Sequence, residues 1–90
     1  MMNMKIRDGF VVREVAGQCV VIALGAATKD FNGMIKLNSS GKLIFEKLSV
    51  GAELEDIVEA MVSEYDIDAD SARRDALNFI EKLQGANILE

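Results

Sequence analysis

The chain has 90 residues, half of them apolar and 28% charged, with a formal net charge of −5 at pH 7. This composition is typical of a globular domain with one modest core and excludes a disordered chain. No apolar run approaches the roughly 18 residues of a membrane span, and no secretory signal is recognisable. We therefore expect a single domain over residues 1–90, and we expect it in the cytoplasm.

The residue inventory excludes several kinds of chemistry. The chain has one cysteine, Cys19, and no histidine. An internal disulfide, a zinc site and Ser-His or Cys-His catalysis are therefore excluded. No acidic cluster has the spacing of a calcium loop. Cys19 lies in an apolar run, where a buried and unreactive thiol is expected. We expect no catalytic residues, no metal and no cofactor.

Charge is unevenly distributed along the chain. Residues 1–48 hold seven basic and four acidic residues, a net charge of +3, whereas residues 49–90 hold three basic and eleven acidic residues, a net charge of −8. Eight acids and no basic residue occur between Glu53 and Asp70. A surface of this kind repels nucleic acid.

The first predicted elements form a β-hairpin. Residues 10–15 (FVVREV) and 18–24 (QCVVIAL) are rich in β-branched residues, which favours strands. Ala16 and Gly17 between them indicate a tight turn. Residues 25–33 are predicted to be a loop.

A short third strand is predicted over residues 34–37 (MIKL), where apolar and polar residues alternate. Ile35 and Leu37 would face one side of this strand, and Met34 and Lys36 the other. The period changes to that of a helix immediately afterwards, so the strand has no loop at its end.

Three helices are predicted in the second half of the chain. Asn38 is a good N-cap for the first helix, whereas the second helix has no good capping residue. Asp68 is a good N-cap for the third helix, and Gly85 is expected to end it. The expected ranges are about 39–50, 53–64 and 69–84.

The third helix has a core stripe and a second apolar edge. On a helical projection with about 100° per residue, the stripe lies within about 40° of Ala72 and the edge at about 80–140° from it. Two interpretations of the edge stay open, a single exposed leucine or one wall of a groove. The stripe comprises Ala72, Ala76, Phe79 and Leu83, and the edge comprises Arg73, Leu77, Ile80 and Gln84.

Several segments resemble a known family. The order of three strands and three helices, LNSSG at their junction, the acidic segment ELEDIVEAMVSEYDID and the closing DALNFIEKLQGANIL resemble the family of coenzyme PQQ synthesis protein D, PqqD. Its domain is also called the RiPP recognition element. The resemblance covers residues 10–89, and Phe45 stands where many relatives have tryptophan.

The resemblance implies an α+β, winged-helix-like fold, a three-stranded antiparallel sheet followed by a three-helix bundle, and no catalytic activity. It implies a chaperone that binds the leader of a ribosomally made precursor peptide and presents it to a modifying enzyme, often a radical SAM enzyme, in PQQ or other RiPP maturation. The leader would add a strand between the third strand and the third helix, as an open sheet edge allows. The resemblance also implies that Arg73 and Lys36 each form an ion pair with a carboxylate of the leader. The expected peptide-binding residues are Met34, Ile35, Lys36, Leu37, Arg73, Leu77, Ile80 and Gln84.

Three other roles are compatible with parts of the sequence. A winged-helix DNA-binding module fits the order of elements, but the third helix is neutral and the second is acidic, whereas a DNA reader carries a basic stripe. A phosphopantetheine carrier would be all-helical and would have its modified serine near mid-chain, whereas Ser71 lies late in this chain and follows a strand-rich half. The open edge strand also allows a weak homodimer beside the monomer.

Overall fold

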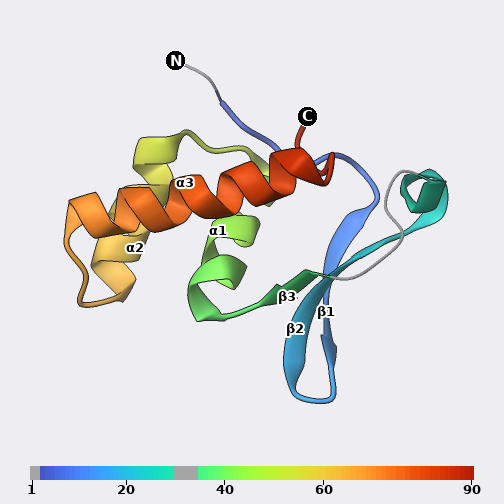
Figure 1. The fold of residues 1–90 in the computed structure, drawn as a ribbon, viewed down its shortest axis with the longest axis horizontal. Helices are drawn as coiled ribbons and strands as arrows, with labels where there is room; N and C mark the ends of the chain where they lie inside the picture. The colour runs from blue at the N-terminus through green and yellow to red at the C-terminus, as the bar shows by residue number, and fades with distance from the viewer. Residues whose placement is uncertain (1–2, 30–34) are drawn as a thin grey trace.

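The computed structural model describes residues 3–29 and 35–90, and it contains a three-stranded antiparallel sheet followed by three α-helices (Figure 1). The expected α+β fold is therefore confirmed. Of the expected site residues, Met34 lies outside the described part of the chain. The elements are β1 (Phe10–Val15), β2 (Gln18–Ala23), a 3-10 helix η1 (Gly25–Lys29), β3 (Ile35–Leu37), α1 (Ser39–Val50), α2 (Leu54–Glu64) and α3 (Ala69–Gly85).

The hairpin of β1 and β2 has the tight turn that the sequence predicts. The strands pair from Phe10 opposite Ala23 to Val15 opposite Gln18. Ala16 has φ 52° and Gly17 has φ 79°, so both turn residues adopt the positive φ of a type I′ turn. The hairpin extends away from the helices (Figure 1).

Side chains at the helix starts accept hydrogen bonds from unpaired backbone amides. The Gly41 amide donates to Asn38 Oδ1 at 2.8 Å in α1, and the Ser71 amide donates to Asp68 Oδ2 at 3.0 Å in α3. The second helix is better capped than expected, because the Glu53 amide donates to Asp56 Oδ2 at 3.0 Å. This is the returning half of a capping box.

The end of α3 differs from the sequence-based expectation. Gly85 is the last residue of the helix, and the left-handed residue is Asn87, with φ 61°. The Ile88 amide donates to the Leu83 carbonyl at 2.9 Å, and the Asn87 amide donates to the Gln84 carbonyl at 3.0 Å. This is a Schellman motif with asparagine in the place that glycine usually takes. It turns Ile88 back into the core.

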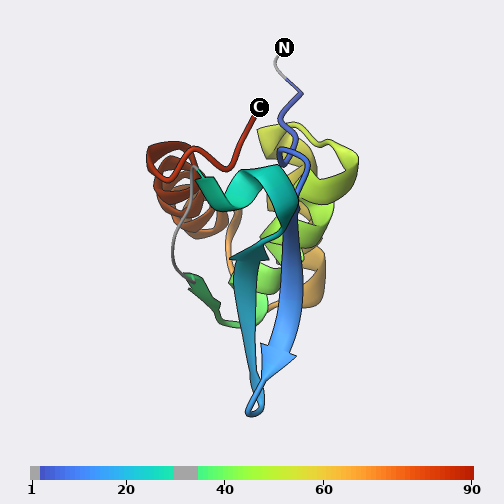
Figure 2. The same ribbon diagram turned by 90° about the vertical axis from the view of Figure 1, so that its right-hand side faces the viewer.

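The core lies between the sheet and the helices, and both ends of the described chain contribute to it. The segment before β1 pairs with distant residues, Met4 with Ala52 and Ile6 with Leu89. These long-range pairs have no local sequence pattern, and they were not predicted. The N-terminal end of the described chain and the C-terminus lie on the same side of the molecule (Figures 1 and 2). The largest fully buried side chains are Phe45, Ile44, Leu48, Ile57, Met61, Leu83, Ile88 and Val21.

The core face of α3 is rotated relative to the predicted stripe. Ile80 is buried at 3% exposure, whereas Phe79 is only half-buried. The mean direction of the buried residues is thus about 35° from Ala72 on the helical projection. The reason is that α2 packs along the Ile80 side of α3, which leaves the Phe79 ring at the edge of the core. No helix in the ranges described is both long and apolar enough to cross a bilayer.

Candidate functional site

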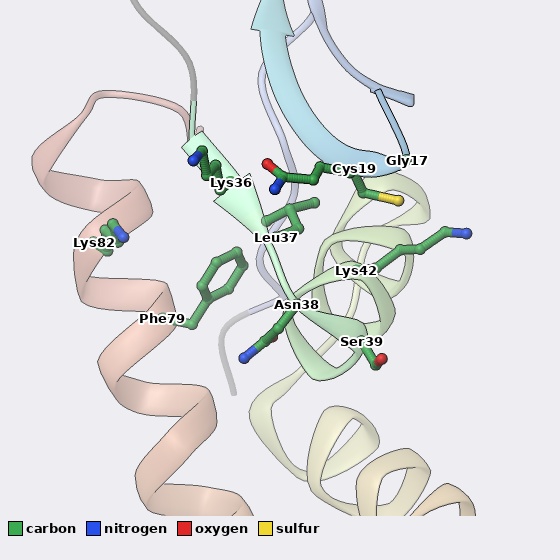
Figure 3. Close-up of a pocket in the computed structure, with 10 residues that line it drawn as sticks. Gly17, Cys19, Lys36, Leu37, Asn38, Ser39, Lys42, Phe79 and Lys82 are labelled. Carbon is green, nitrogen blue, oxygen red and sulfur yellow. The ribbon is translucent and has the colours of Figure 1, made fainter. Parts of the chain in front are cut away.

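The strand β3 has one edge that no described strand covers. The sheet order is β1-β2-β3, and β3 pairs with β2 alone, with Val20 opposite Lys36. Its other edge faces α3, because β3 lies between β2 and α3 (Figure 3). An edge strand presents N–H and C=O groups that an extended peptide can pair with.

A groove of about 800 Å³ follows this strand, and we call it the β3–α3 groove. Leu37 and Phe79 form its apolar centre, and the Phe79 ring points from α3 towards Leu37 (Figure 3). A smaller adjoining hollow includes Asp75 and Asn78 of α3. The lining residues of the groove are Gly17, Gln18, Cys19, Lys36, Leu37, Asn38, Ser39, Lys42, Phe79 and Lys82.

Gly41 lies where the Asn38 cap, the end of β3 and the Phe79 ring come together. A Cβ atom on Gly41 would lie 3.5 Å from Phe79 Cε1 and 3.4 Å from Leu37 Cδ2, which are ordinary van der Waals distances, and 3.2 Å from Asn38 Oδ1. A side chain at position 41 would therefore press on the capping oxygen of Asn38 rather than on the Phe79 ring. The same glycine belongs to the LNSSG segment of the sequence.

The groove carries positive charge although the chain is acidic overall. Lys36, Lys42 and Lys82 line it, and none of these lysines forms an ion pair with another described residue. Lys36 and Lys82 lie at the same end of the groove, whereas Lys42 extends on the side of β2 (Figure 3). Asp75 is the acidic residue of the adjoining hollow. An acidic partner is therefore favoured here.

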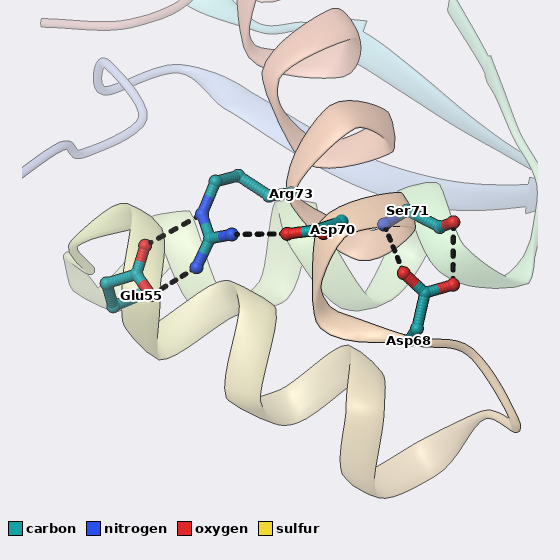
Figure 4. Close-up of polar contacts among 5 residues, drawn as sticks. All are labelled: Glu55, Asp68, Asp70, Ser71 and Arg73. Atoms are coloured by element: carbon teal, nitrogen blue, oxygen red, sulfur yellow. Dashed lines mark hydrogen bonds and ion pairs between the residues drawn. The ribbon is translucent and has the colours of Figure 1, made fainter.

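The expected wall residues of α3 lie on the other side of that helix. The Arg73 guanidinium is held by Glu55 of α2, with Nη2 to Oε1 at 2.8 Å and Nε to Oε2 at 3.1 Å, and by Asp70 at 3.5 Å (Figure 4). The hydrogen bond from Arg73 lowers the pKa of the Glu55 carboxyl, and the same contact raises the pKa of Arg73. Leu77, like Arg73, faces away from β3.

The structure therefore brings together some of the expected site residues and separates others. Lys36 and Leu37 line the groove, whereas Ile35 is 8% exposed and belongs to the core. The expectation that the second apolar edge of α3 stands opposite β3 is not met, because that edge faces α2. The residues placed there are Arg73, Leu77, Ile80 and Gln84.

Sequence reasoning missed the two residues that α3 does contribute to the groove, Phe79 and Lys82. On the helical projection they lie at about −20° and −80° from Ala72, on the side of the stripe that was not considered. The available signal was a large aromatic residue at the border of the stripe, followed by a lysine one turn later.

The single cysteine and the acidic residues complete the description of the site. Cys19 is half-buried and lines the β3–α3 groove, so it is less buried than expected. Within residues 3–29 and 35–90, no three Cys, Asp or Glu side chains are grouped so that they could hold a metal ion.

Comparisons with known proteins identify the fold and the family. The structure is similar to "TbiB1 in Complex with the TbiA(beta) Leader Peptide", with a TM-score of 0.75 and 28% identity, covering 96% of this chain and 94% of that one. It shares its fold with "Lasso peptide synthetase B1 complexed with the leader peptide", with a TM-score of 0.76 and 21% identity, covering 97% and 96% of the two chains. No curated protein sequence matches significantly. The model of the family described as coenzyme PQQ synthesis protein D (PqqD) matches residues 18–89, and the chain therefore belongs to the PqqD family.

Proposed function

We propose that this protein binds the leader segment of a ribosomally made precursor peptide and presents it to a modifying enzyme. The leader adds a strand to the open edge of β3. The observation that carries the proposal is this edge, which lies beside a groove with an apolar centre and with lysines that form no ion pair with another described residue. Support comes from the family match and from the two solved structures of similar fold, each of which is described as a complex with a leader peptide.

The groove suggests which leader side chains bind and where. In an added strand, alternate side chains point to the same side, so an apolar residue of the leader contacts Phe79 and Leu37. An acidic leader residue lies near Lys36 and Lys82. Backbone pairing supplies affinity that depends little on sequence, and the side-chain contacts supply specificity.

The role that we propose is non-catalytic and cytoplasmic, since precursor peptides are made by ribosomes. The family resemblance implies a radical SAM enzyme or a similar peptide-modifying enzyme as the partner. The proposal covers PQQ and other ribosomally made products alike.

The alternative of a DNA-binding module receives less support from the site. DNA readers place basic side chains on an exposed helix face that enters a groove of the duplex. Here the lysines surround an apolar centre, and Arg73 of α3 is bound by two acids. This arrangement favours a peptide over a nucleic acid.

The test is a titration of ¹⁵N-labelled protein with candidate leader peptides. We expect the largest amide shifts at residues 35–38 and 79–82 and little change at 53–56. Phe79→Ala should weaken binding, and Leu77→Ala, on the opposite side of α3, is the matched control. Saturable binding with its largest shifts at 53–56 would contradict the proposed groove.

A further inference from the structure

A second groove lies between α2, α3 and the N-terminal segment, and we call it the acidic groove. Its volume is about 560 Å³. Ile80 is buried beneath it, Leu54 and Met4 are half-buried, and Leu77 is 42% exposed. The lining residues are Met4, Glu53, Leu54, Glu55, Leu77, Ile80, Glu81 and Gln84.

The charge of this groove is opposite to that of the β3–α3 groove. Its lining contains Glu53, Glu55 and Glu81 and no basic residue. The nearby Arg73 already binds Glu55 and Asp70, so it does not neutralise the remaining acids. Arg74 is exposed on the outer face of α3 but does not line the groove.

The two grooves lie on opposite sides of α3. Leu77 and Phe79 are separated by about 160° around the helix. A ligand in one groove therefore does not block the other, and α3 is shared by both. A domain that presents a peptide to an enzyme needs two separate surfaces of this kind.

We propose that the acidic groove is the docking site for the modifying enzyme, which inserts an apolar side chain flanked by lysine or arginine. The apolar floor selects the inserted side chain, and the glutamates attract the basic residues around it. This inference rests on the proposed function, because it assumes an enzyme to which the leader is presented. A second molecule of this protein is a poor occupant, because pairing two acidic grooves would bring their glutamates together.

The experiment uses a probe of the stated chemistry, a fluorescent synthetic helical peptide with a leucine stripe flanked by lysines. Its twin has glutamate at every lysine position. We expect the lysine peptide to bind in an anisotropy titration and to shift amides at 53–55 and 77. The glutamate twin should not bind.

Paired variants test whether binding occurs in the acidic groove. Leu77→Asp should weaken probe binding by about five- to tenfold, whereas Val62→Asp should not, although Val62 has the same 42% exposure. Glu81→Lys should also weaken probe binding, whereas its control, Glu64→Lys on α2, should not. If Leu77→Asp and Glu81→Lys both bind the probe like the wild type, the inference is wrong.

Two further readouts separate the alternatives. If sedimentation shows self-association that Leu77→Asp abolishes, the occupant is a second copy and the docking proposal is wrong. The leader titration is run on the same variants, which should retain leader affinity. Failure of the wild-type protein to bind the probe contradicts the docking site, whereas failure of the wild-type protein to bind the leader contradicts the proposed function and leaves the charge complementarity of the acidic groove intact.

Discussion

Arg73 of α3 and Glu55 of α2 form a two-point ion pair, with contacts of 2.8 and 3.1 Å, between helices that are separated by a turn (Figure 4). Its hydrogen bond lowers the pKa of Glu55 below the ordinary 4.5. A lowered pKa in the folded state stabilises the protein above the unfolded pKa, and this contribution is lost as the pH falls through the folded pKa. Below about pH 5, the free energy of unfolding should therefore decrease less steeply with falling pH in Glu55→Gln than in the wild type.

The measurement is urea unfolding at a series of pH values from neutral to acidic. Glu59→Gln is the matched control, because Glu59 is exposed on the same helix and has no ion pair among the described contacts. We expect Glu59→Gln to keep the wild-type slope. Parallel curves for the wild type and Glu55→Gln would show that the ion pair does not contribute in solution.

Charge in the β3–α3 groove gives a second prediction. Lys82→Glu should weaken binding of an acidic leader by about three- to tenfold, since it reverses one of the unpaired charges. Lys47→Glu, on α1 and outside the groove, is the control. Raising the salt concentration should weaken wild-type binding because the screening length is only about 10 Å at 0.1 M. Binding by Lys82→Glu that equals the wild type at low salt would contradict the role of this lysine.

Asn38 allows the helix cap and the groove to be tested separately. Asn38→Ala removes the acceptor for the Gly41 amide and should destabilise the fold by about 1 kcal/mol. Asn38→Asp keeps an acceptor at the same place, so the free energy of unfolding should change little. The negative charge of the new side chain lies beside the groove, so it should weaken the binding of an acidic leader, as measured in an anisotropy titration. If both variants lose equal stability, the side-chain cap is not the cause.

The elements with local signals were predictable from the sequence. The hairpin turn at Ala16 and Gly17 and the caps at Asn38 and Asp68 are confirmed, because each depends on residues within a few positions of one another. The pairing of Ile6 with Leu89 was not predictable in this way, since it joins the two ends of the chain.

The candidate site was only half predictable for a related reason. The open edge of β3 follows from the order of elements, and Lys36 and Leu37 lie in the groove as expected. Which side of α3 meets that edge depends on how the helix is rotated against α2. A rotation of about 25° relative to the predicted stripe exchanges the roles of Phe79 and Ile80, and periodicity alone does not determine it.

The hairpin turn gives the last prediction. Ala16 is exposed and has φ 52°, a conformation that costs an ordinary residue roughly 1 kcal/mol. Ala16→Asn creates the Asn-Gly pair that type I′ turns favour and should raise the free energy of unfolding by about 0.5–1 kcal/mol. Ala16→Val should lower it, because a β-branched residue is strained at positive φ. Urea unfolding of both variants measures the effect.

The same turn bears on the site, because β2 pairs with β1 on one edge and with β3 on the other. Ala16→Asn should therefore also slow hydrogen exchange at the β3 amides that donate to β2, provided that β3 opens together with the hairpin. Unchanged exchange at those amides in a stabilised variant would show that β3 opens independently. In that case β3, to which we propose that the leader adds, would be held by α1 and the Asn38 cap rather than by the hairpin.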